Sequence, residues 1–483
     1  MIWTLTGRSL KKAWQPLTTT MTPMPTNSYN NNSDRNSKKG VPFVYDGGLP
    51  FFACVRDYLK DNGYSFSICG GNYGAKCGRC KVRFKSNAPL PDAIERKLLT
   101  PDELRDGVRL ACRTNPKPSA RVSILFGNKT EIVTKSKAIE ESLMPERDVV
   151  AIDLGTSTVA FSYWDSKQKK ERLYKADNPQ IKYGSDVISR IDATKRLGRD
   201  VISNELCEFL YEGLKEVSGG ATLKDVPVYI GGNTIMLHVL AGEDASGLGA
   251  YPFTPVFLDE RKITYKDVTF TLLPGISAFV GADITAGLIS EGILPVNSKS
   301  KGRLFVDLGT NAELALCTGE KIYCTACAAG SAFSTDAGVG SEGISALAVL
   351  LKEGKVDRTG LLLDESAPIT QKDIRDIQLA KAAVATGIQI LLKKSGFDYK
   401  DITNVSIAGG FGFYLNVDDA ASIGLIPKEL KEKTYASGNT CLRGSLIYDK
   451  VEKELKDFRE SFVPIESALE EGFDDLFMRQ VDF

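Results

Sequence analysis

Histidine is nearly missing from the sequence: His238 is the only one in 483 residues. This count excludes a histidine-rich metal site, and it excludes a Rieske-type iron–sulfur cluster, which needs two histidine ligands. The formal net charge is zero, because 61 basic residues balance 61 acidic ones. A dedicated nucleic-acid-binding protein carries an excess of basic residues, so we expect no nucleic-acid partner.

Long apolar runs are also missing. No stretch approaches the roughly 20 apolar residues that a membrane-spanning helix needs, so we expect no membrane span. The ten cysteines are too few and too clustered for a secreted disulfide scaffold of this length. Together these features predict a reducing, cytoplasmic location.

Two common nucleotide-binding motifs are absent. The sequence has no G-x-x-x-x-G-K-[ST] P-loop, and no strand–G-x-G-x-x-G–helix unit with an acidic residue about 20 positions later. A P-loop site and a Rossmann dinucleotide site are therefore excluded. The length still allows two or three domains with a large core.

Four cysteines form a metal-ligand pattern. Cys69, Cys77, Cys80 and Cys112 follow the spacing C-x7-C-x2-C-x31-C. Plant-type ferredoxins hold a [2Fe–2S] cluster with four cysteines in a similar arrangement, and soft thiolate ligands suit iron. Glycines between the first three cysteines let the loop wrap closely around a cluster. We predict these four as iron ligands, with Cys54 on a preceding helix as the fallback for Cys69.

The composition divides the chain into four parts. Residues 1–40 are polar and low in complexity, which predicts a disordered tail, with a transit peptide as the alternative. Residues 41–127 predict a small α+β domain of the ferredoxin-like (β-grasp) type, and residues 128–148 predict an irregular linker. Over residues 149–483, strands such as VVAID, RLFVD and NVSIAG alternate with helical patterns such as QLAKAAVATGIQILLKKSG. This alternation predicts one large α/β domain.

A short motif occurs twice in the large domain. VVAIDLGTSTVAFSYWD contains Asp153, Gly155, Thr156, Ser157 and Thr158, and RLFVDLGTNAELALC contains Asp307, Gly309, Thr310, Asn311 and Glu313. Each copy predicts a strand, a tight D-L-G-T turn and a second strand. Turn amides and hydroxyls donate hydrogen bonds to phosphate oxygens, while aspartates hold Mg²⁺ through water or orient an attacking water. We predict that both turns bind phosphate and that Asp153 and Asp307 are catalytic.

A glycine-rich turn follows a later strand. The string IAGGFGFYLN contains Gly409, Gly410, Phe411 and Gly412. Adjacent glycines after a strand let a nucleoside approach the backbone, although a tight strand–helix turn explains them equally well. Together with the two D-L-G-T turns, this element resembles the superfamily of acetate and sugar kinases, Hsp70 and actin (ASKHA). That resemblance implies an actin-like ATPase domain with duplicated halves and with ATP and Mg²⁺ in the cleft between them.

Longer strings resemble the reductive activators of corrinoid proteins. They are NPQIKYGSDVISRI (178–191), IGGNTIMLHVLAG (230–242), LGAYPFTP (248–255), FVGADITAG (279–287) and TQKDIRDIQLAKAA (370–383). The resemblance implies that the chain uses ATP to pass one electron from a [2Fe–2S] cluster to a corrinoid methyl-transfer protein, returning Co(II) to Co(I). It also implies a low-potential electron donor, and it leaves a homodimer open.

The chain departs from that family at three points. The x7 loop is longer than usual, which makes Cys69 the least secure ligand. The middle domain of larger relatives is expected to be missing, and AAGSAFSTDAGVGSEG differs from the family string, which leaves the partner open. Other functions stay open: electron donation to another low-potential metalloenzyme, a superfamily kinase with an appended iron–sulfur domain, or a nucleotide-binding regulator.

The remaining reactive side chains are expected to be structural. Cys324 and Cys327 form a C-x-x-C without a second pair nearby, which favours buried thiols over a redox pair. His238 follows an apolar helical pattern and is expected to pack or to cap. Core positions are predicted for Cys207, Cys317 and Cys441. Either partner steering or ordinary solvation explains the charges beside the cysteine cluster, Lys76, Arg79 and Lys81.

Overall fold

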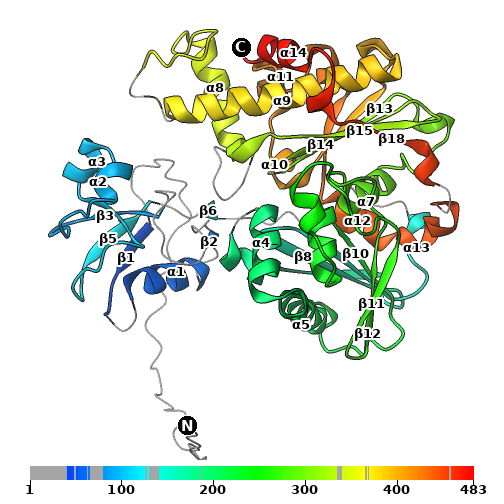
Figure 1. Cartoon of the computed structure of the whole chain (residues 1–483), viewed down its shortest axis with the longest axis horizontal. Coiled ribbons are helices and arrows are strands. Elements are labelled where there is room, and N and C mark those ends of the chain that lie inside the picture. Colours follow the sequence, from blue (N-terminus) through cyan, green and yellow to red (C-terminus); the bar gives the residue numbers. More distant parts are fainter. Residues whose placement is uncertain are drawn as a thin grey trace, which may run out of the picture. The chain divides into compact units, whose positions relative to one another are not determined.

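A computed structural model describes residues 41–47, 50–61, 64–65, 80–125, 128–129, 141–184, 186–309, 311–333, 340–364, 367, 369–455 and 458–483. These residues belong to one structural unit. Within these ranges, no helix is long and apolar enough to cross a membrane. The described residues build three sheets of four or more strands, one near the N-terminus and two in the rest of the chain (Figure 1).

The N-terminal sheet has four antiparallel strands in the order β1-β5-β3-β4. These strands are β1 (Val41–Val44), β5 (Arg121–Ile124), β3 (Lys81–Phe84) and β4 (Val108–Leu110). Helix α1 (Phe51–Asp61) places Phe51, Val55 and Leu59 one turn apart, and all three are almost fully buried. They share a core with strand residues such as Val82 and Val122, as an amphipathic helix does when it packs on a sheet.

Short elements complete this part of the chain. They are β2 (Tyr64–Ser65), α2 (Glu95–Leu98), α3 (Pro101–Arg105) and β6 (Asn128–Lys129). The sequence predicts an irregular linker over residues 128–148. The described residues of this range include strand β6, which pairs antiparallel with β2, and the 3-10 turn η1 (Glu141–Leu143). Backbone pairing was missed here because a two-residue strand leaves no periodic pattern in a sequence.

The first six-stranded sheet has the order β11-β12-β10-β7-β8-β9. Its strands are β7 (Val149–Leu154), β8 (Thr158–Asp165), β9 (Lys170–Asp177), β10 (Val228–Gly232), β11 (Arg261–Tyr265) and β12 (Val268–Leu272). Central strand β7 pairs parallel with β10 and antiparallel with β8, and its apolar residues are buried on both faces.

The second six-stranded sheet repeats this plan in the order β17-β16-β13-β14-β15-β18. Its strands are β13 (Arg303–Leu308), β14 (Ala312–Cys317), β15 (Ile322–Cys327), β16 (Asn404–Ala408), β17 (Thr434–Gly438) and β18 (Phe462–Pro464). Strands β13, β14 and β15 run antiparallel like β7, β8 and β9, and β16 and β17 join in parallel like β10 and β12. The predicted duplication is therefore confirmed in the topology.

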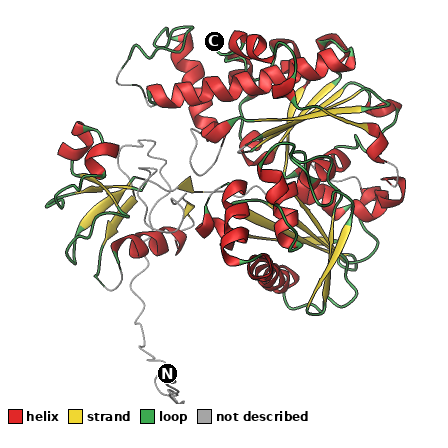
Figure 2. Cartoon of the chain, in the orientation of Figure 1, coloured by secondary structure: helices red, strands yellow, loops and turns green. Residues whose placement is uncertain are grey.

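Two central helices lie between the six-stranded sheets (Figure 2). They are α7 (Ala282–Ser290) and α12 (Thr440–Leu446). A Cβ added at Gly444 would overlap the carbonyl oxygen of Ala286, so the two helix backbones touch. One added at Gly287 would lie 2.5 Å from the ring of Phe305 on β13, so α7 also packs directly on the second sheet. Glycine at these two positions permits the close approach.

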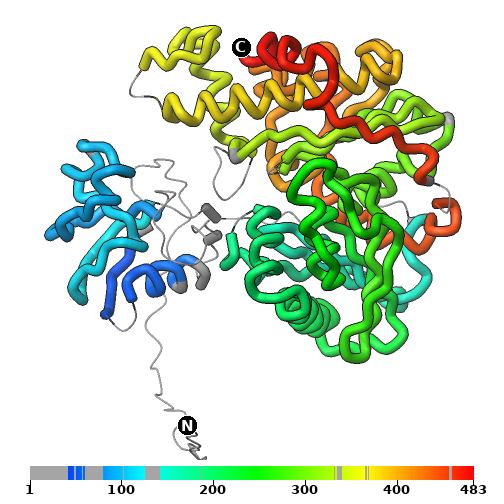
Figure 3. Tube along the Cα trace, viewed as in Figure 1, coloured from blue at the N-terminus to red at the C-terminus, as the bar shows by residue number. Residues whose placement is uncertain are grey.

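The remaining helices flank the sheets. They are α4 (Val187–Leu197), α5 (Arg199–Ser218), α6 (Thr234–Leu240), α8 (Gly340–Lys352), α9 (Gln371–Ser395), α10 (Gly409–Phe413), α11 (Val417–Ser422), α13 (Tyr448–Val451) and α14 (Phe473–Arg479). The predicted helix in the string QLAKAAVATGIQILLKKSG is confirmed within α9, which begins earlier because Thr370 and Asp373 form a capping box. After α13 the chain, red in Figure 3, returns to the second sheet as β18.

The chain enters the second sheet after α7 and leaves β17 of that sheet into α12. Glu291, the residue that follows α7, contacts both of these connections. Its carboxylate pairs with Arg443 on α12 at 2.7 Å and with Arg303 on β13 at 3.6 Å. It also accepts a hydrogen bond of 2.7 Å from the hydroxyl of Tyr435 on β17. Glu291 and Arg443 are both buried. One buried carboxylate thus joins the elements that lead into and out of the second sheet.

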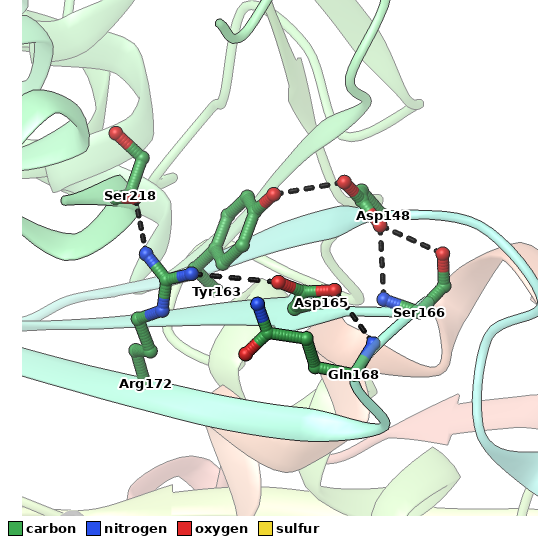
Figure 4. A network of polar contacts seen from close by, with 7 residues as sticks. All are labelled: Asp148, Tyr163, Asp165, Ser166, Gln168, Arg172 and Ser218. Atoms are coloured by element: carbon green, nitrogen blue, oxygen red, sulfur yellow. Dashed lines mark hydrogen bonds and ion pairs between the residues drawn. The ribbon is translucent and has the colours of Figure 1, made fainter. Parts of the chain in front are cut away.

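A polar network fixes the start of β7 (Figure 4). Asp148 accepts hydrogen bonds from the hydroxyl of Tyr163 at 2.8 Å and from the backbone N–H and hydroxyl of Ser166 at 2.9 and 2.7 Å. Arg172 on β9 pairs with Asp165 at 3.4 Å and donates to the last carbonyl of α5. Burial, followed by the nearby carboxylates, raises the pKa of Tyr163 to about 12, so this hydroxyl remains a donor. The network holds β7 at the end opposite its D-L-G-T turn.

Candidate functional site

The two D-L-G-T turns occupy the same place in each half. The first turn joins β7 to β8 and the second joins β13 to β14, so Asp153 and Asp307 both lie near the end of a central strand. A Cβ added at Gly155 would lie 2.6 Å from the carbonyl oxygen of Thr158, so only glycine fits that tight turn. In the second turn the Gly309 N–H donates to the Asn311 carbonyl at 2.8 Å. Thr310 lies outside the described residues.

Neighbouring side chains brace the first turn. Asn178 donates to the Gly155 carbonyl at 2.9 Å, and its backbone N–H donates to the Ser157 carbonyl at 2.8 Å. The buried Arg190 donates to the Thr156 carbonyl at 2.9 Å. All three turn carbonyls are therefore satisfied by donors. An approaching phosphate would not meet bare carbonyl oxygens, so the amides and hydroxyls of the turn remain the groups suited to an anion.

Four carboxylates form an acidic cluster beside the turns: Asp153 on β7, Asp283 on α7, Asp307 on β13 and Glu313 on β14. Each retains partial solvent exposure, although protein surrounds it closely. Burial raises the pKa of all four, to about 7 for Asp283 and about 8 for Asp307. Charges on the neighbouring carboxylates add to the rise for Asp283, Asp307 and Glu313.

The acidic cluster suits a cation that arrives with a ligand. Among the described residues, no group of three or more histidine, cysteine or acidic side chains is arranged to hold a metal ion alone. Mg²⁺ commonly uses one or two carboxylates and takes its other ligands from water and phosphate. Burial is the main cause of the raised pKa values and repulsion between the carboxylates adds to them, so a divalent cation bound here would favour the ionised forms. The donor set therefore fits Mg²⁺ bound together with phosphates.

Three residues of this site were not predicted from the sequence. Asp283 is the second residue of α7, and its carboxylate accepts from the Ile284 N–H at 2.9 Å. Asn439, just before α12, donates to the Asp153 carboxylate at 2.8 Å. Cys441 was predicted as core and is buried, but its thiol contacts Asp153. Burial and the nearby carboxylates raise the pKa of Cys441 far above its usual value.

The signal that could have revealed Asp283 and Cys441 is positional. Each is the second residue of a central helix, in corresponding places of the two halves. An alignment of the two halves beyond their D-L-G-T turns would therefore have matched Asp283 with Cys441 and placed each residue near the central strands. Asn439 offers no such signal, because asparagine before a helix is an ordinary cap.

The glycine-rich turn touches the second D-L-G-T turn. Gly409 has φ +85°, and an added Cβ would lie 2.6 Å from the Asp307 carboxylate and 2.5 Å from the Leu308 carbonyl oxygen. Gly410 is exposed, with no atom near the Cβ position. Phe411 is buried with its ring centroid 4.7 Å from that of Phe333, and Gly412 lies against Ile407. Gly410 is thus open to a ligand, whereas Phe411 and Gly412 pack in the core.

Two of the four predicted iron ligands lie together. The Sγ atoms of Cys80 and Cys112 are 3.2 Å apart, close enough for one thiol to hydrogen-bond to the other. Two thiolates on one tetrahedral metal with bonds near 2.3 Å would lie about 3.8 Å apart, so this spacing needs little adjustment to accept a shared iron. The contact with Cys80, followed by nearby Arg113, lowers the pKa of Cys112. Cys69 and Cys77 lie outside the described residues.

The other reactive side chains have structural partners. His238 is buried, with Nδ1 2.7 Å from the Thr234 carbonyl and with Nε2 accepting from the Val256 N–H at 3.0 Å, which agrees with the predicted packing role. Buried positions are confirmed for Cys207, Cys317, Cys324 and Cys327. Cys54 lies on α1, 3.8 Å from Asp46, and Lys81 pairs with Glu103 at 2.6 Å.

Family profiles match most of the chain. The profile of the RACo middle region matches residues 149–294, and that of the C-terminal ASKHA domain of RACo matches residues 301–360 and 358–483. The first profile covers the first α/β half, so the family's middle region is present. The expectation that a middle domain is missing is therefore wrong. The family's middle region corresponds to the first α/β half itself, and not to an additional domain before residue 149.

Curated relatives and a solved structure agree with these profiles. The corrinoid activation enzyme RamQ of Eubacterium limosum is 28% identical over 382 residues, which are 62% of this chain and 63% of RamQ. The chain thus spans somewhat less than two thirds of that relative. The [Co(II) methylated amine-specific corrinoid protein] reductase of Methanosarcina barkeri is 25% identical over 375 residues, or 61% of this chain and 68% of that protein.

The solved structure is a reductive activator for corrinoid, iron–sulfur protein. It matches with a TM-score of 0.60 at 20% identity and covers 92% of this chain and 98% of its own. At that identity the match shows a shared fold. The topology, the profiles and the relatives agree that the chain belongs to the RACo family, with the family's middle region followed by its C-terminal ASKHA domain.

Proposed function

We propose that this chain is an ATP-dependent reductive activator, which passes one electron from a [2Fe–2S] cluster to a corrinoid protein and returns Co(II) to Co(I). The observation that carries the proposal is the presence, in one RACo-family chain, of two adjacent thiols at Cys80 and Cys112 and of an acidic cluster between duplicated D-L-G-T turns. The first feature suits a metal cluster, and the second suits Mg²⁺ and a nucleotide.

The proposed division of labour follows the chain. Residues 41–127 would form a ferredoxin-like β-grasp domain, residues 128–148 a linker and residues 149–483 the ATPase domain, while the tail predicted for residues 1–40 lies outside the described residues. Two thiols 3.2 Å apart, one directly before β3 and one just after β4 of an antiparallel sheet with a covering helix, support the ferredoxin assignment for residues 41–127. Cys69 and Cys77 would complete the ligand set, and a low-potential donor would reduce the cluster.

The proposed nucleotide site uses both halves of the ATPase domain. The turn residues Gly155, Thr156, Ser157 and Thr158, with Gly309, Thr310 and Asn311, would hold the phosphates. Asp153 and Asp307 would hold Mg²⁺ through water and orient the attacking water, and the Gly409–Gly412 turn would lie beside the nucleoside at Gly410. The satisfied carbonyls of the first turn and the crowded carboxylates support these roles.

ATP is needed because the electron transfer is uphill. Plant-type [2Fe–2S] clusters have potentials near about −400 mV. The family resemblance places Co(II)/Co(I) below that value. Each ~60 mV of uphill one-electron transfer costs about 1.4 kcal/mol. Binding and hydrolysis of ATP in the paired halves would drive the conformational change that covers this difference.

One experiment tests cluster, cofactor and coupling together. The purified full chain should show a [2Fe–2S] absorption spectrum and should reduce a Co(II) corrinoid protein to Co(I) only with ATP and a low-potential reductant. The variants Cys80→Ser and Cys112→Ser should lose the spectrum, whereas Cys54→Ser should keep it. Complete reduction without ATP would contradict the coupling, and a colourless wild-type chain after reconstitution with iron and sulfide would contradict the electron-transfer role.

A further inference from the structure

Asn439 lies where the chain passes from the second sheet to a central helix. Strand β17 ends at Gly438, and α12 begins at Thr440. The Asn439 side chain is buried, with 8% of its surface exposed. Both ends of its amide are bonded: Oδ1 accepts from the Leu442 N–H at 2.8 Å, and Nδ2 donates to Asp153 Oδ2 at 2.8 Å. Asn439 therefore caps α12 and contacts the acidic cluster at the same time.

The orientation of this amide follows from the cap. A helix N-terminus presents backbone N–H groups, so the oxygen must face Leu442 and the nitrogen must face Asp153. The hydrogen bond from Asn439 Nδ2 therefore fixes the direction from which Asp153 Oδ2 accepts. Asp153 also lies on β7 of the first sheet, whereas Asn439 directly follows a strand of the second. The bond therefore joins a carboxylate of one half to a crossover from the other.

A second asparagine shows the same construction on the first turn. Asn233 caps α6 by accepting from the Met236 N–H at 2.9 Å, and its Nδ2 donates to the Thr156 hydroxyl oxygen at 3.2 Å. Two helix caps thus converge on the strand and turn that contain Asp153 and Thr156. Asn233 comes from the same half as this turn, whereas Asn439 arrives from the crossover.

We propose that Asn439 is a positioning residue for the Asp153 carboxylate, which it holds in a fixed orientation only while the crossover from the second half stays in place. This inference rests on the proposed ATPase function. It adds that catalysis by Asp153 depends on a donor supplied from the other half, so a movement of β17 relative to β7 would alter hydrolysis without any change at the D-L-G-T turns.

The test separates the cap from the donor. Serine is a good helix cap, so Asn439→Ser keeps α12 capped but removes the N–H donor to Asp153, whereas Asn439→Ala removes both. The matched control is Asn297→Ser. Asn297 also uses both ends of its amide, since it accepts from the Lys299 N–H at 2.9 Å and donates to the Pro295 carbonyl at 3.0 Å, but it is exposed and outside the acidic cluster.

The measurements are the kcat and KM of ATP hydrolysis by the full chain and its melting temperature. For Asn439→Ser we expect a kcat about 10-fold to 100-fold below wild type, the range for a hydrogen bond to a charged group, with KM unchanged. Asn439→Ala should lose the same activity and also melt about 1–2 °C lower than Asn439→Ser. Asn297→Ser should hydrolyse ATP like wild type.

Each outcome decides between the two proposals. If Asn439→Ser keeps the wild-type kcat while Asn439→Ala does not, the residue is only a cap and the inference is wrong, although the proposed function stands. A loss that appears only as a higher KM would also overturn it, because Asn439 would then act in binding. If the wild-type chain neither binds nor hydrolyses ATP, the proposed function fails and the inference fails with it.

Discussion

Replacing Gly409 with alanine should damage the acidic cluster through one added methyl group. The backbone there has φ +85°, and the new Cβ would lie 2.6 Å from the Asp307 carboxylate and 2.5 Å from the Leu308 carbonyl oxygen. A left-handed conformation costs a non-glycine residue about 1–2 kcal/mol. Overpacking adds about 1–3 kcal/mol. We therefore expect Gly409→Ala to lower the free energy of unfolding by about 2–5 kcal/mol.

Gly396→Ala is the matched control for this change. Gly396 ends α9 with φ +72°, but no atom lies within 4 Å of its Cβ position. In Gly396→Ala the free energy of unfolding should therefore fall only by the cost of the left-handed conformation, about 1–2 kcal/mol. Any larger loss in Gly409→Ala then measures the contact with Leu308 and Asp307.

Urea unfolding of both variants gives the two free energies, and ATP hydrolysis reports on Asp307. Since a displacement of about 1 Å at a reacting group can lower a rate about 100-fold, Gly409→Ala should hydrolyse ATP poorly, whereas Gly396→Ala should resemble wild type. Equal destabilisation in the two variants, with wild-type hydrolysis in both, would refute the close approach of this turn to Asp307.

Three further changes test the fold and the charges of the site. Glu291→Ala should lower the free energy of unfolding by about 3–5 kcal/mol in urea titrations, because it leaves the buried Arg443 without a carboxylate, and a loss below about 1 kcal/mol would contradict this. Gly444→Ala should abolish cooperative unfolding or the folded state itself, since its Cβ overlaps the Ala286 carbonyl oxygen, and a wild-type melting curve would contradict the helix contact. Burial raises the pKa of Asp307 from 3.8 to about 8, so the folded chain holds a proton that the unfolded chain has released. The free energy of unfolding should therefore fall as pH rises through that window, and Asp307→Asn should flatten the fall in metal-free thermal melts, whereas an unchanged profile would contradict the raised pKa.

Much of the α/β fold was predictable because local patterns and the duplication agree. Strands β7, β13 and β16 are apolar runs at the predicted positions, and the repeated D-L-G-T turns mark the same connection in each half. A central strand buried on both faces must be apolar throughout, so its signal in a sequence is strong. The resemblance to RACo strings then indicated the family that the profiles show.

The rest of the site depends on contacts between distant segments. Asp283, Asn439 and Cys441 are brought to Asp153 by the packing of α7 and α12, where Gly444 lets the helix backbones touch. No local pattern encodes that contact, since a single glycine in an apolar helix has many explanations. The sequence therefore predicted the site residues that belong to motifs. It did not predict the residues that reach the site only because α7 and α12 pack together.

The two halves share the same arrangement of strands and central helices, but they differ in the charge of the side chains that they bring to the site. Asp283 and Cys441 hold the same position in α7 and α12, yet one is an acid and the other is a thiol. A fifth carboxylate at residue 441 would add repulsion to a cluster in which burial and mutual charge already raise the pKa of Asp283 and Asp307. Burial raises the pKa of the Cys441 thiol as well, which keeps it neutral. At this position the second half thus contributes an uncharged thiol and the Asn439 donor where the first contributes a carboxylate, so α12 and its cap add no negative charge to the cluster and supply a hydrogen bond to Asp153 instead.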